Sequence, residues 1–438
     1  MPRQFIALAA SMSLCAAASA QSKNPAIFVA NNGNLEGSVT SMLVNPDGSL
    51  TFVQKLVTGT APNTSNPDWG TNCYSIAISP DGRHLAIGHA SADSMPGRMT
   101  IMSVNTDATI VQQGAFNIPR TPMSIVWLDD EHIAVTETRS SGTNRVRVYH
   151  YAWEEAELTL TDFEPTGSFT SSLALHASGQ YLFPQNSLGG ASISSFKVNP
   201  GGTLDFVQTV GTGGTYPLGL GTSPNGRWLY AGGGISSGGK AIIGYDIDPN
   251  TGMLTVQPGS PYTSPGSSPK QVVVSSDNAY AIAGHGTDAT VRTFSIHPST
   301  GALTPTGFFF DVGVQGSLGD LTIMGDLLFV PDRDTIFDGI RGVYSFTLNA
   351  NGSLTQNGPI VDTQGIGPNA IAAWPGKTGP APCLADLNGD QSVDVQDLLT
   401  LLSSWGKCGG FCPADLNGDN AVDVLDLLIL LAAWGPCR

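Results

Sequence analysis

A pattern of four short strands recurs along residues 26–375, at intervals of about 46 to 52 residues. In each copy an apolar strand leads through a Pro-Asp-Gly-like turn into a second apolar strand, and two further strands follow a polar loop. The first two strands are clearest in SIAISPDGRHLAIGHA, which begins at Ser75, and in LGLGTSPNGRWLYAGGG, which begins at Leu218. One repeat cannot bury its apolar faces alone, whereas a ring of repeats can. The pattern therefore predicts the blades of a β-propeller.

The two ends of the repeat region predict how the ring closes. The first copy begins at its second strand, residues 26–30, and the missing first strand is found at residues 370–374 (AIAAW). One blade is then assembled from both ends of the region, which leaves no sheet edge unpaired. With this composite blade the count is seven. We expect an all-β seven-bladed propeller over residues 21–375.

The composition fits an all-β chain and excludes one class of partner. Only 12% of the 438 residues are charged and 53 are glycine, as expected for a protein with many tight turns. The formal net charge of −16 argues against binding of nucleic acid.

Residues 1–20 have the pattern of a secretory signal peptide. Arg3 precedes an apolar stretch at residues 5–17, and Ala18-Ser19-Ala20 forms a small-residue cleavage site. Cys15 raises the alternative of a lipoprotein signal, but Leu14 stands before it where a small residue is expected. No other apolar run reaches the length of a membrane-spanning helix. We expect a protein secreted to the cell surface or beyond, without a membrane span.

The PDGR and PNGR turns, together with later D-G-x-L and T-G-x-L turns, resemble the lactonase family of seven-bladed propellers. That family contains 6-phosphogluconolactonase-like hydrolases and carboxymuconate-lactonizing enzymes, and the resemblance covers residues 26–375. It implies an Arg from a Gly-Pro-Arg-His phrase at the start of one blade. It also implies a Glu at the end of that blade's second strand and a His from the preceding blade.

The matching blade departs from this pattern. SFTSSLALHASGQYLFPQNSL places Ser171 at the Arg position and Ser187 at the Glu position. The preceding blade keeps an acid, Glu137, but has Met123 at its Arg position. We therefore expect a binding or scaffold module, with Glu137 as the one candidate catalytic residue. The alternative is an active sugar-lactone hydrolase that serves extracellular carbohydrate or polysaccharide breakdown.

Other polar side chains are expected at the mouth of the central channel, where first strands begin and second strands end. They could form a pocket for a small anionic or sugar-lactone ligand, or be no more than solvated residues of the channel. Besides Glu137, the candidates are Asn32, His89, Arg139, Asn186, Lys270, His285, Asp332 and Arg333. His132 and His176 lie beside turns on the opposite side, and we expect them to be structural.

After a linker at residues 376–382, two similar segments place oxygen-bearing residues at positions 1, 3, 5, 9 and 12 of a calcium-binding loop. The first set is Asp386, Asn388, Asp390, Asp394 and Asp397, and the second is Asp415, Asn417, Asp419, Asp423 and Asp426. Backbone carbonyls at Ser392 and Ala421 would add a ligand to each. The sequence thus predicts two calcium ions. Position 6, where Gly is usual, holds Gln391 and Asn420, so we expect the first loop to bind more weakly.

The duplicated loops, the Asp at position 12 and the Leu-Leu pairs behind it resemble type I dockerin modules over residues 383–437. The resemblance implies a small α-helical calcium-binding domain at residues 383–438 and a cohesin-like or other cell-surface partner for its helices. The apolar helix positions are Leu398, Leu399, Leu402, Trp405, Leu427, Leu428, Leu431 and Trp434.

Four cysteines bracket the two loop-helix units at identical spacing. Disulfides are expected in an exported module of this size, and we favour Cys383–Cys408 and Cys412–Cys437. Other pairings and a zinc site are the alternatives. Cys73, in the propeller, is expected to be a buried, inert thiol.

Overall fold

The computed structural model describes residues 24–61, 70–90, 96–138, 144–213, 217–233, 239–312, 318–333, 342–376, 385, 387, 392–407, 414, 416 and 421–436. Contacts within the chain define one compact unit at Asn24–Gly376 and a second that contains Lys377–Arg438. Among the described residues, no helix combines the length and apolar character needed to cross a membrane.

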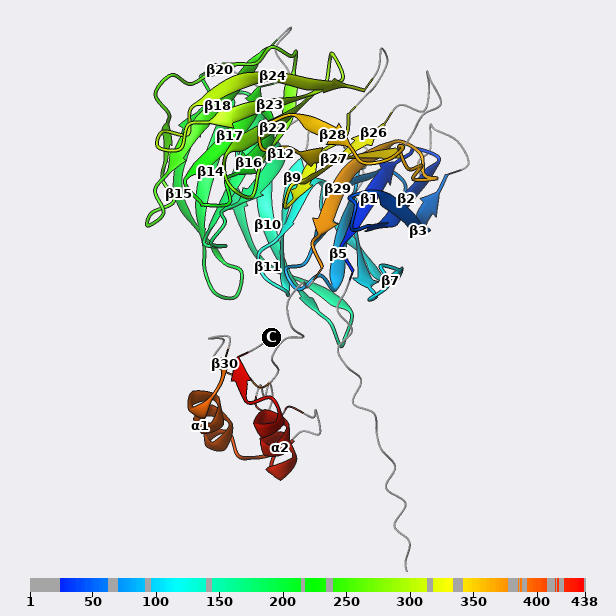
Figure 1. Ribbon diagram of the computed structural model, residues 1–438, viewed down its shortest axis with the longest axis vertical. Coiled ribbons are helices and arrows are strands. Elements are labelled where there is room, and N and C mark those ends of the chain that lie inside the picture. The colour runs from blue at the N-terminus through cyan, green and yellow to red at the C-terminus, as the bar shows by residue number, and fades with distance from the viewer. Residues whose placement is uncertain are drawn as a thin grey trace, which may run out of the picture. The chain divides into compact units, whose positions relative to one another are not determined.

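The first unit is a seven-bladed β-propeller, as predicted (Figure 1). Blade 1 contains β1 (Ala26–Asn32), β2 (Glu36–Val44), β3 (Leu50–Thr60) and β29 (Pro368–Trp374). Blade 2 contains β4 (Cys73–Ile78), β5 (His84–His89), β6 (Gly97–Val104) and β7 (Ile110–Ile118). Blade 3 contains β8 (Thr121–Trp127), β9 (His132–Thr138), β10 (Arg145–Ala152) and β11 (Glu157–Pro165). Blade 4 contains β12 (Ser168–Leu175), β13 (Tyr181–Leu188), β14 (Ser192–Val198) and β15 (Leu204–Gly211).

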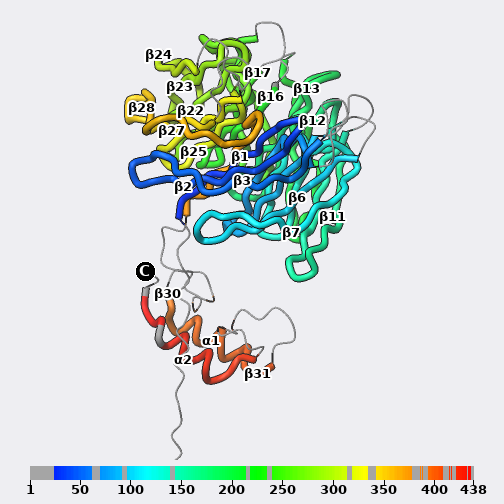
Figure 2. Tube along the Cα trace, turned by 90° about the vertical axis from the view of Figure 1, so that its right-hand side faces the viewer, coloured from blue at the N-terminus to red at the C-terminus, as the bar shows by residue number. Residues whose placement is uncertain are grey.

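Blades 5 to 7 repeat this arrangement. Blade 5 contains β16 (Pro217–Thr222), β17 (Trp228–Gly233), β18 (Ala241–Ile247), β19 (Leu254–Val256) and β20 (Tyr262–Thr263). Blade 6 contains β21 (Pro269–Val274), β22 (Tyr280–His285), β23 (Thr290–Ile296) and β24 (Leu303–Asp311). Blade 7 contains β25 (Thr322–Met324), β26 (Leu327–Asp332), β27 (Gly342–Leu348) and β28 (Leu354–Gln356). The innermost strands, in ring order β29, β4, β8, β12, β16, β21 and β25, each contact the next. Figure 2 labels β12, β16 and β25 of this set.

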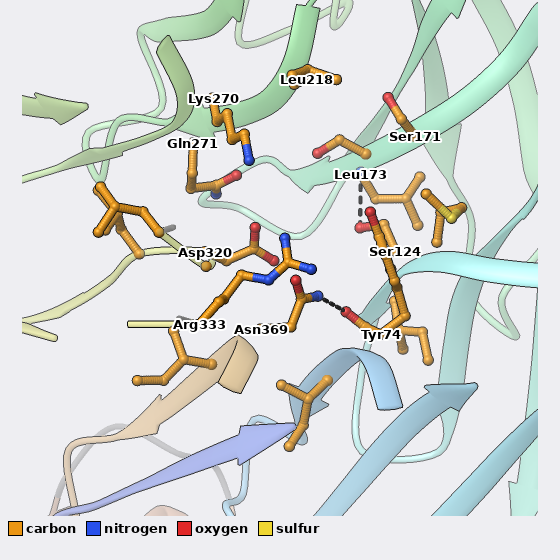
Figure 3. Close-up of a pocket in the computed structure, with 18 of the residues that line it drawn as sticks. Tyr74, Ser124, Ser171, Leu173, Leu218, Lys270, Gln271, Asp320, Arg333 and Asn369 are labelled. Atoms are coloured by element: carbon orange, nitrogen blue, oxygen red, sulfur yellow. Dashed lines mark hydrogen bonds between the residues drawn. The ribbon is translucent and has the colours of Figure 1, made fainter. Parts of the chain in front are cut away.

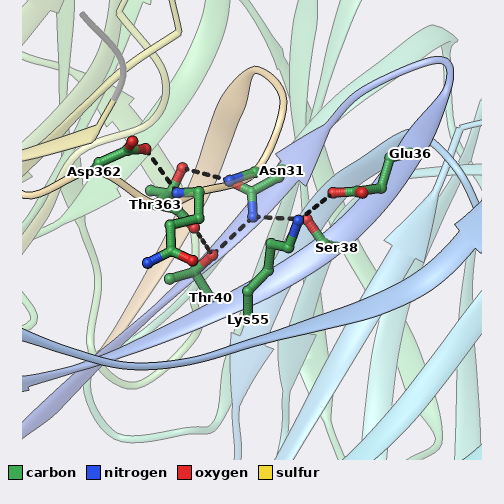
Figure 4. A network of polar contacts seen from close by, with 9 residues as sticks. Asn31, Glu36, Ser38, Thr40, Lys55, Asp362 and Thr363 are labelled. Atoms are coloured by element: carbon green, nitrogen blue, oxygen red, sulfur yellow. Dashed lines mark hydrogen bonds and ion pairs between the residues drawn. The ribbon is translucent and has the colours of Figure 1, made fainter.

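The composite blade is confirmed. Strand β29 pairs antiparallel with β1, with Trp374 opposite Ala26 and Ile371 opposite Val29, and the two lie side by side in Figure 1. A polar network at the end of β1 joins the same two parts of the chain (Figure 4). There Asn31 donates to Ser38 Oγ (3.1 Å) and Thr40 Oγ1 (3.0 Å), and Thr40 donates to the carbonyl of Thr363 (2.7 Å). The ring is therefore closed by ladder pairing and by buried side-chain bonds.

A repeated hydrogen bond joins neighbouring blades. A hydroxyl on the third strand of one blade donates to the carbonyl of a turn glycine in the next, from Ser195 to Gly252 (2.7 Å) and from Thr293 to Gly352 (2.7 Å). Ser345 of blade 7 makes the same bond to Gly48 of blade 1 (2.6 Å). The closing interface thus has the same construction as interfaces inside the repeat.

The second unit contains α1 (Val395–Ser403), α2 (Val424–Ala432), and the short strands β30 (Ser392–Val393), β31 (Gly406–Lys407), β32 (Ala421–Val422) and β33 (Gly435–Pro436). Strand β30 pairs with β33 and β31 with β32, so each loop-helix segment pairs with the other. Leu401 and Leu430 are the fully buried apolar side chains among the described helix residues, and they pack with Val393 and Val422. Leu399, Leu402 and Trp405 of the expected apolar face are exposed, as are Leu428, Leu431 and Trp434.

Candidate functional site

A cavity of about 410 Å³ lies at the centre of the propeller. All seven blades contribute to its wall, mainly through residues near the start of their innermost strands. The polar lining residues are Tyr74, Ser124, Ser171, Ser172, Lys270, Gln271, Asp320, Arg333 and Asn369. The sequence predicts polar side chains at a mouth where first strands begin and second strands end. The cavity lies at that end of the blades.

Three charged side chains, from blades 6 and 7, point into this space (Figure 3). Lys270 is the second residue of β21, Asp320 precedes β25, and Arg333 directly follows β26. The backbone N–H of Asp320 donates to the carbonyl of Asn369 (2.7 Å) and so fixes the segment against the closing strand β29. A Cβ on Gly319 would lie only 2.1 Å from that same carbonyl, so this close approach requires glycine.

The three charged groups perturb one another inside the cavity. Burial raises the pKa of Asp320 to about 6, although the charges of Lys270 and Arg333 act to lower it. Burial and the Arg333 charge lower the pKa of Lys270, against the attraction of Asp320. Burial and the Asp320 charge raise the pKa of the Tyr74 phenol, so that this group remains a hydrogen-bond donor.

The three charges act on one another, but none of them forms an ion pair with a residue that the structure describes. Within the part of the chain that the structure describes, the ion pairs involve other residues, and none includes Lys270, Asp320 or Arg333. Lys270 and Arg333 are half-buried and Asp320 is exposed to the cavity, so each has lost part of its hydration and can gain from binding an opposite charge. Two cations beside an acid of nearly neutral pKa can bind an anion, and the acid can exchange a proton with a ligand or with water.

Of the predicted mouth residues that the structure describes, only Lys270 and Arg333 line the cavity. The two histidines do not reach it. His89 is buried beside the Thr71 carbonyl (3.1 Å) and Thr100 Oγ1 (2.8 Å), and His285 beside Ser264 Oγ (2.6 Å) and the Thr290 carbonyl (3.2 Å). Burial lowers the pKa of each imidazole to about 4. Both are neutral side chains inside their blades at physiological pH.

Three further candidates also lie away from the cavity lining. The side chain of Asn186 accepts a hydrogen bond from Thr170 (2.9 Å) and donates one to Ser192 (3.2 Å) inside blade 4. Asp332 is fully buried at the end of β26, and Asn32 is half-buried at the end of β1. Arg139 lies outside the described residues. The residues that line the cavity therefore differ from those predicted for the pocket, because most of the predicted side chains that the structure describes turn into the blades.

Glu137 is likewise placed outside the cavity lining. Its carboxylate is 1% exposed and forms an ion pair with Arg147 Nε on the neighbouring strand β10 (2.6 Å). The Arg147 guanidinium in turn lies 5.1 Å from the centre of the Phe163 ring. The Glu137 carboxylate thus joins β9 to β10 and is not among the residues that line the central cavity.

The positions at which the family resemblance implies Arg and Glu are neutral and adjacent. Ser171 Oγ and Ser187 Oγ are 2.5 Å apart, and Gln185 donates to Ser171 Oγ (3.2 Å). Ser171 and Met123 both line the cavity. Blades 3 and 4 thus present a neutral wall, while the charges come from blades 6 and 7, across the ring.

Asp320 was absent from the sequence-based candidates. The inner strand of blade 7 contains only three residues, Thr322–Met324, so it begins after Asp320 and its pattern does not include this residue. The sequence nevertheless held a signal. Asp320 lies four residues before Met324, the last residue of its strand, and Lys270 lies equally far before Val274, the last residue of β21. His132 and His176, expected to be structural, lie beside Asp129 (2.9 Å) and the Gly226 carbonyl (2.8 Å).

The described parts of the two C-terminal loops share one arrangement. Asp397 is fully buried and accepts hydrogen bonds from the N–H groups of Leu387 (2.8 Å) and Asp394 (2.9 Å). Asp426 is bonded in the same way, to Leu416 (2.7 Å) and Asp423 (2.8 Å). A carboxylate at position 12 that folds back over its own loop fits a calcium loop.

Much of the remaining prediction falls on residues that the structure does not describe. These are Asp386, Asn388, Asp390, Asp415, Asn417, Asp419 and the cysteines Cys383, Cys408, Cys412 and Cys437. Among the residues that it does describe, no cluster of three His, Cys, Asp or Glu side chains could hold a metal ion. In the propeller, Cys73 is a buried free thiol, and burial raises its pKa to about 12.

A closed ring of seven sheets around a polar cavity defines the class of protein as a seven-bladed β-propeller. The profile of the family described as "Lactonase, 7-bladed beta-propeller" matches residues 18–262. The chain belongs to this family, as its turn motifs indicated.

Solved structures support the same fold at low sequence identity. A putative 6-phosphogluconolactonase from Bacteroides uniformis matches with a TM-score of 0.63 and 15% identity, over 80% of this chain and 100% of its own. The periplasmic gluconolactonase PpgL of Pseudomonas aeruginosa matches with a TM-score of 0.62 and 16% identity, over 80% and 98%. A putative 6-phosphogluconolactonase from Bacteroides fragilis matches with a TM-score of 0.59 and 17% identity, over 81% and 99%. No curated protein sequence matches the chain.

Proposed function

We propose that the propeller binds a small anionic sugar derivative, such as an aldonate or a sugar lactone with an acidic substituent, in its central cavity. The observation that carries this proposal is the presence of Lys270 and Arg333 in one cavity without an ion-pair partner among the described residues. An anionic ligand would compensate both charges. A volume of about 410 Å³ is within the range of small-molecule sites.

Hydroxyl-bearing ligands fit the rest of the wall. Asp320 can accept hydrogen bonds, while Tyr74, Gln271 and Asn369 present polar groups around it. Apolar side chains such as Ile76, Leu218 and Leu321 complete the lining and can cover the carbon skeleton of a sugar acid. These features support a ligand of mixed polarity with at least one negative charge.

A second candidate function is the hydrolysis of sugar lactones. Membership of the lactonase family favours it, as does an acid in the cavity with a pKa near neutrality. The neutral residues Ser171, Ser187 and Met123 at the family's charged positions require such an enzyme to use other side chains.

Calorimetric titration of the full chain tests the binding proposal. The probes are D-gluconate, 6-phosphogluconate and neutral glucose. We expect saturable binding of the two anions and at least tenfold weaker binding to Lys270→Gln and to Arg333→Gln. Arg227→Gln, which removes a surface cation, is the matched control and should bind as the wild type does. Equal affinity for glucose, or unchanged affinity in both cavity variants, would rule out the proposed site.

We further propose that the chain is exported after loss of residues 1–20 and is anchored by a calcium-loaded, dockerin-like module. The matching bonds of Asp397 and Asp426, and the capping boxes at the start of both helices, support two loops of the same construction. The exposed apolar residues of both helices support a protein partner, such as a cohesin-like domain on the cell surface.

Calcium titration of the full chain tests the anchor. We expect two bound ions, with one lost in Asp397→Asn and the other in Asp426→Asn. The remaining site in Asp397→Asn should be the tighter one, because the first loop has Gln391 at its sixth position. A chain that takes up no calcium, or a wild type whose C-terminal unit melts identically with and without chelator, would refute the assignment.

A further inference from the structure

We propose that Asp320 is the base of a lactone-opening centre built on blades 6 and 7, with Arg333 and Lys270 as the groups that stabilise the developing negative charge. This inference rests on the second candidate function, lactone hydrolysis. It assigns that reaction to residues outside the positions at which the family resemblance implies Arg and Glu.

The geometry of the cavity carries the assignment. Among the lining residues that the structure describes, Asp320 is the one carboxylate, whereas Glu137 is paired with Arg147 and Asp332 lies outside the lining. Its side chain points into the same space as Lys270 and Arg333 (Figure 3). No hydrogen bond or ion pair within the described chain occupies its oxygens, so both are available to a water molecule or a substrate.

The position of Asp320 is fixed by the closing blade. Its backbone N–H is bonded to Asn369, and the Asn369 side chain donates to the carbonyl of Tyr74 (2.7 Å) on the neighbouring inner strand. Asp320 lies in the segment that leads into β25 and is therefore held against β29. A base that must meet a bound ring at one distance needs this kind of rigid support.

The electrostatics suit proton transfer near neutral pH. Burial raises the pKa of Asp320, so the group is mostly ionised at pH 7 yet basic enough to accept a proton from water. The guanidinium N–H groups of Arg333 can stabilise an oxyanion. Ser171 and Met123, across the ring, are neutral. A polarised carbonyl would therefore bind on the charged side of the cavity.

The reaction balances with water as the only co-substrate. Asp320 takes a proton from a water molecule while the water oxygen forms a bond to the lactone carbonyl carbon. The carbonyl oxygen becomes an oxyanion beside Arg333 and Lys270. When this intermediate collapses, the bond from carbon to the ring oxygen breaks. The protonated Asp320 then returns its proton to the ring oxygen, which leaves as a hydroxyl. The new carboxylic acid ionises and remains as a carboxylate opposite the two cations.

Kinetics of the full chain on a panel of five- and six-membered sugar lactones test this centre. The wild type should open at least one lactone faster than the buffer blank. Asp320→Asn should lose at least a hundredfold in kcat while KM changes by less than about threefold, as expected for loss of a general base. Lys270→Gln and Arg333→Gln should also raise KM for acidic lactones. Glu137→Gln should retain kcat if it folds, and Ser187→Ala serves as a second control at the family's Glu position.

The outcomes separate this inference from the binding proposal. Unchanged kcat in Asp320→Asn, or activity that depends on Glu137 in a folded variant, overturns the assignment of the base. A wild type that binds D-gluconate but opens no lactone overturns it as well and leaves the binding proposal standing. Retention of gluconate binding in Asp320→Asn, together with loss of turnover and of the acidic limb of the pH–rate profile, supports it.

Discussion

Replacing Asp320 by Asn should stabilise the propeller at neutral pH. Burial raises the pKa of this carboxyl from its ordinary value of 3.8 to about 6. Each pKa unit corresponds to about 1.4 kcal/mol of differential interaction between the two protonation states. Because the Asp320 side chain is exposed to the water of the cavity, solvent screening reduces this cost, and the neutral, nearly isosteric amide should gain no more than about 1 kcal/mol at pH 7. A structural ion-pair partner would show the opposite sign.

The pH dependence of this effect has a definite direction. The folded-state pKa lies above the unfolded value, so the group imposes no penalty below about pH 4, where it is protonated in both states. The penalty grows as pH rises through the interval from about 4 to 6 and is constant above it. The difference in unfolding free energy between Asp320→Asn and the wild type should follow the same curve.

Chemical denaturation at a series of pH values measures this difference. Asp277→Asn is the matched control, because hydrogen bonds from Ser275 Oγ and the N–H of Ala279 lower the pKa of Asp277. That variant should be destabilised at neutral pH, and the loss should disappear as pH falls. A destabilised Asp320→Asn at pH 7, or a gain that does not change between pH 4 and 7, would refute the reasoning about the cavity.

Three further predictions concern the rest of the propeller. Trp374→Ala removes a buried side chain from the closing strand and should lower the unfolding free energy by about 3–5 kcal/mol; a loss below 1 kcal/mol in denaturant titrations would contradict a tightly closed ring. Cys73 should resist alkylation in the native chain and react after unfolding, because burial raises its pKa to about 12; rapid native labelling, read by mass spectrometry, would contradict this. The ring of His285 should titrate near pH 4 in NMR spectra, because burial disfavours its charged form, and a midpoint at 6.5 or above would show that the ring reaches solvent.

The repeat period and the chain ends were sufficient to predict the architecture. Because a propeller repeat is only stable in a closed ring, the absence of a first strand before residue 26 required a partner for β1 elsewhere, and AIAAW at residues 370–374 was the remaining candidate. The rule that first strands begin and second strands end at one mouth placed Lys270 and Arg333 in the cavity. Both inferences depend only on strand order and direction.

Side-chain partners across strands could not be obtained in this way. His89 and His285 have the spacing of mouth residues, but their rings bind carbonyls and hydroxyls that come from other turns and strands of their blades. Glu137 is bound by Arg147, which lies two residues beyond its direct cross-strand neighbour Arg145. Such diagonal pairs are common on antiparallel sheets, and considering them would have assigned Glu137 to an ion pair. Asp320 was missed because its strand is too short to show the pattern.

The central claim, that an anionic sugar derivative binds against Lys270 and Arg333, is tested most directly by a crystal structure of the full chain with D-gluconate at a saturating concentration. We predict that the gluconate carboxylate lies within hydrogen-bond distance of Lys270 Nζ or the Arg333 guanidinium, with a ligand hydroxyl against Asp320. A cavity without gluconate in crystals of a chain that binds it in solution, or gluconate bound elsewhere on the propeller, would contradict the claim.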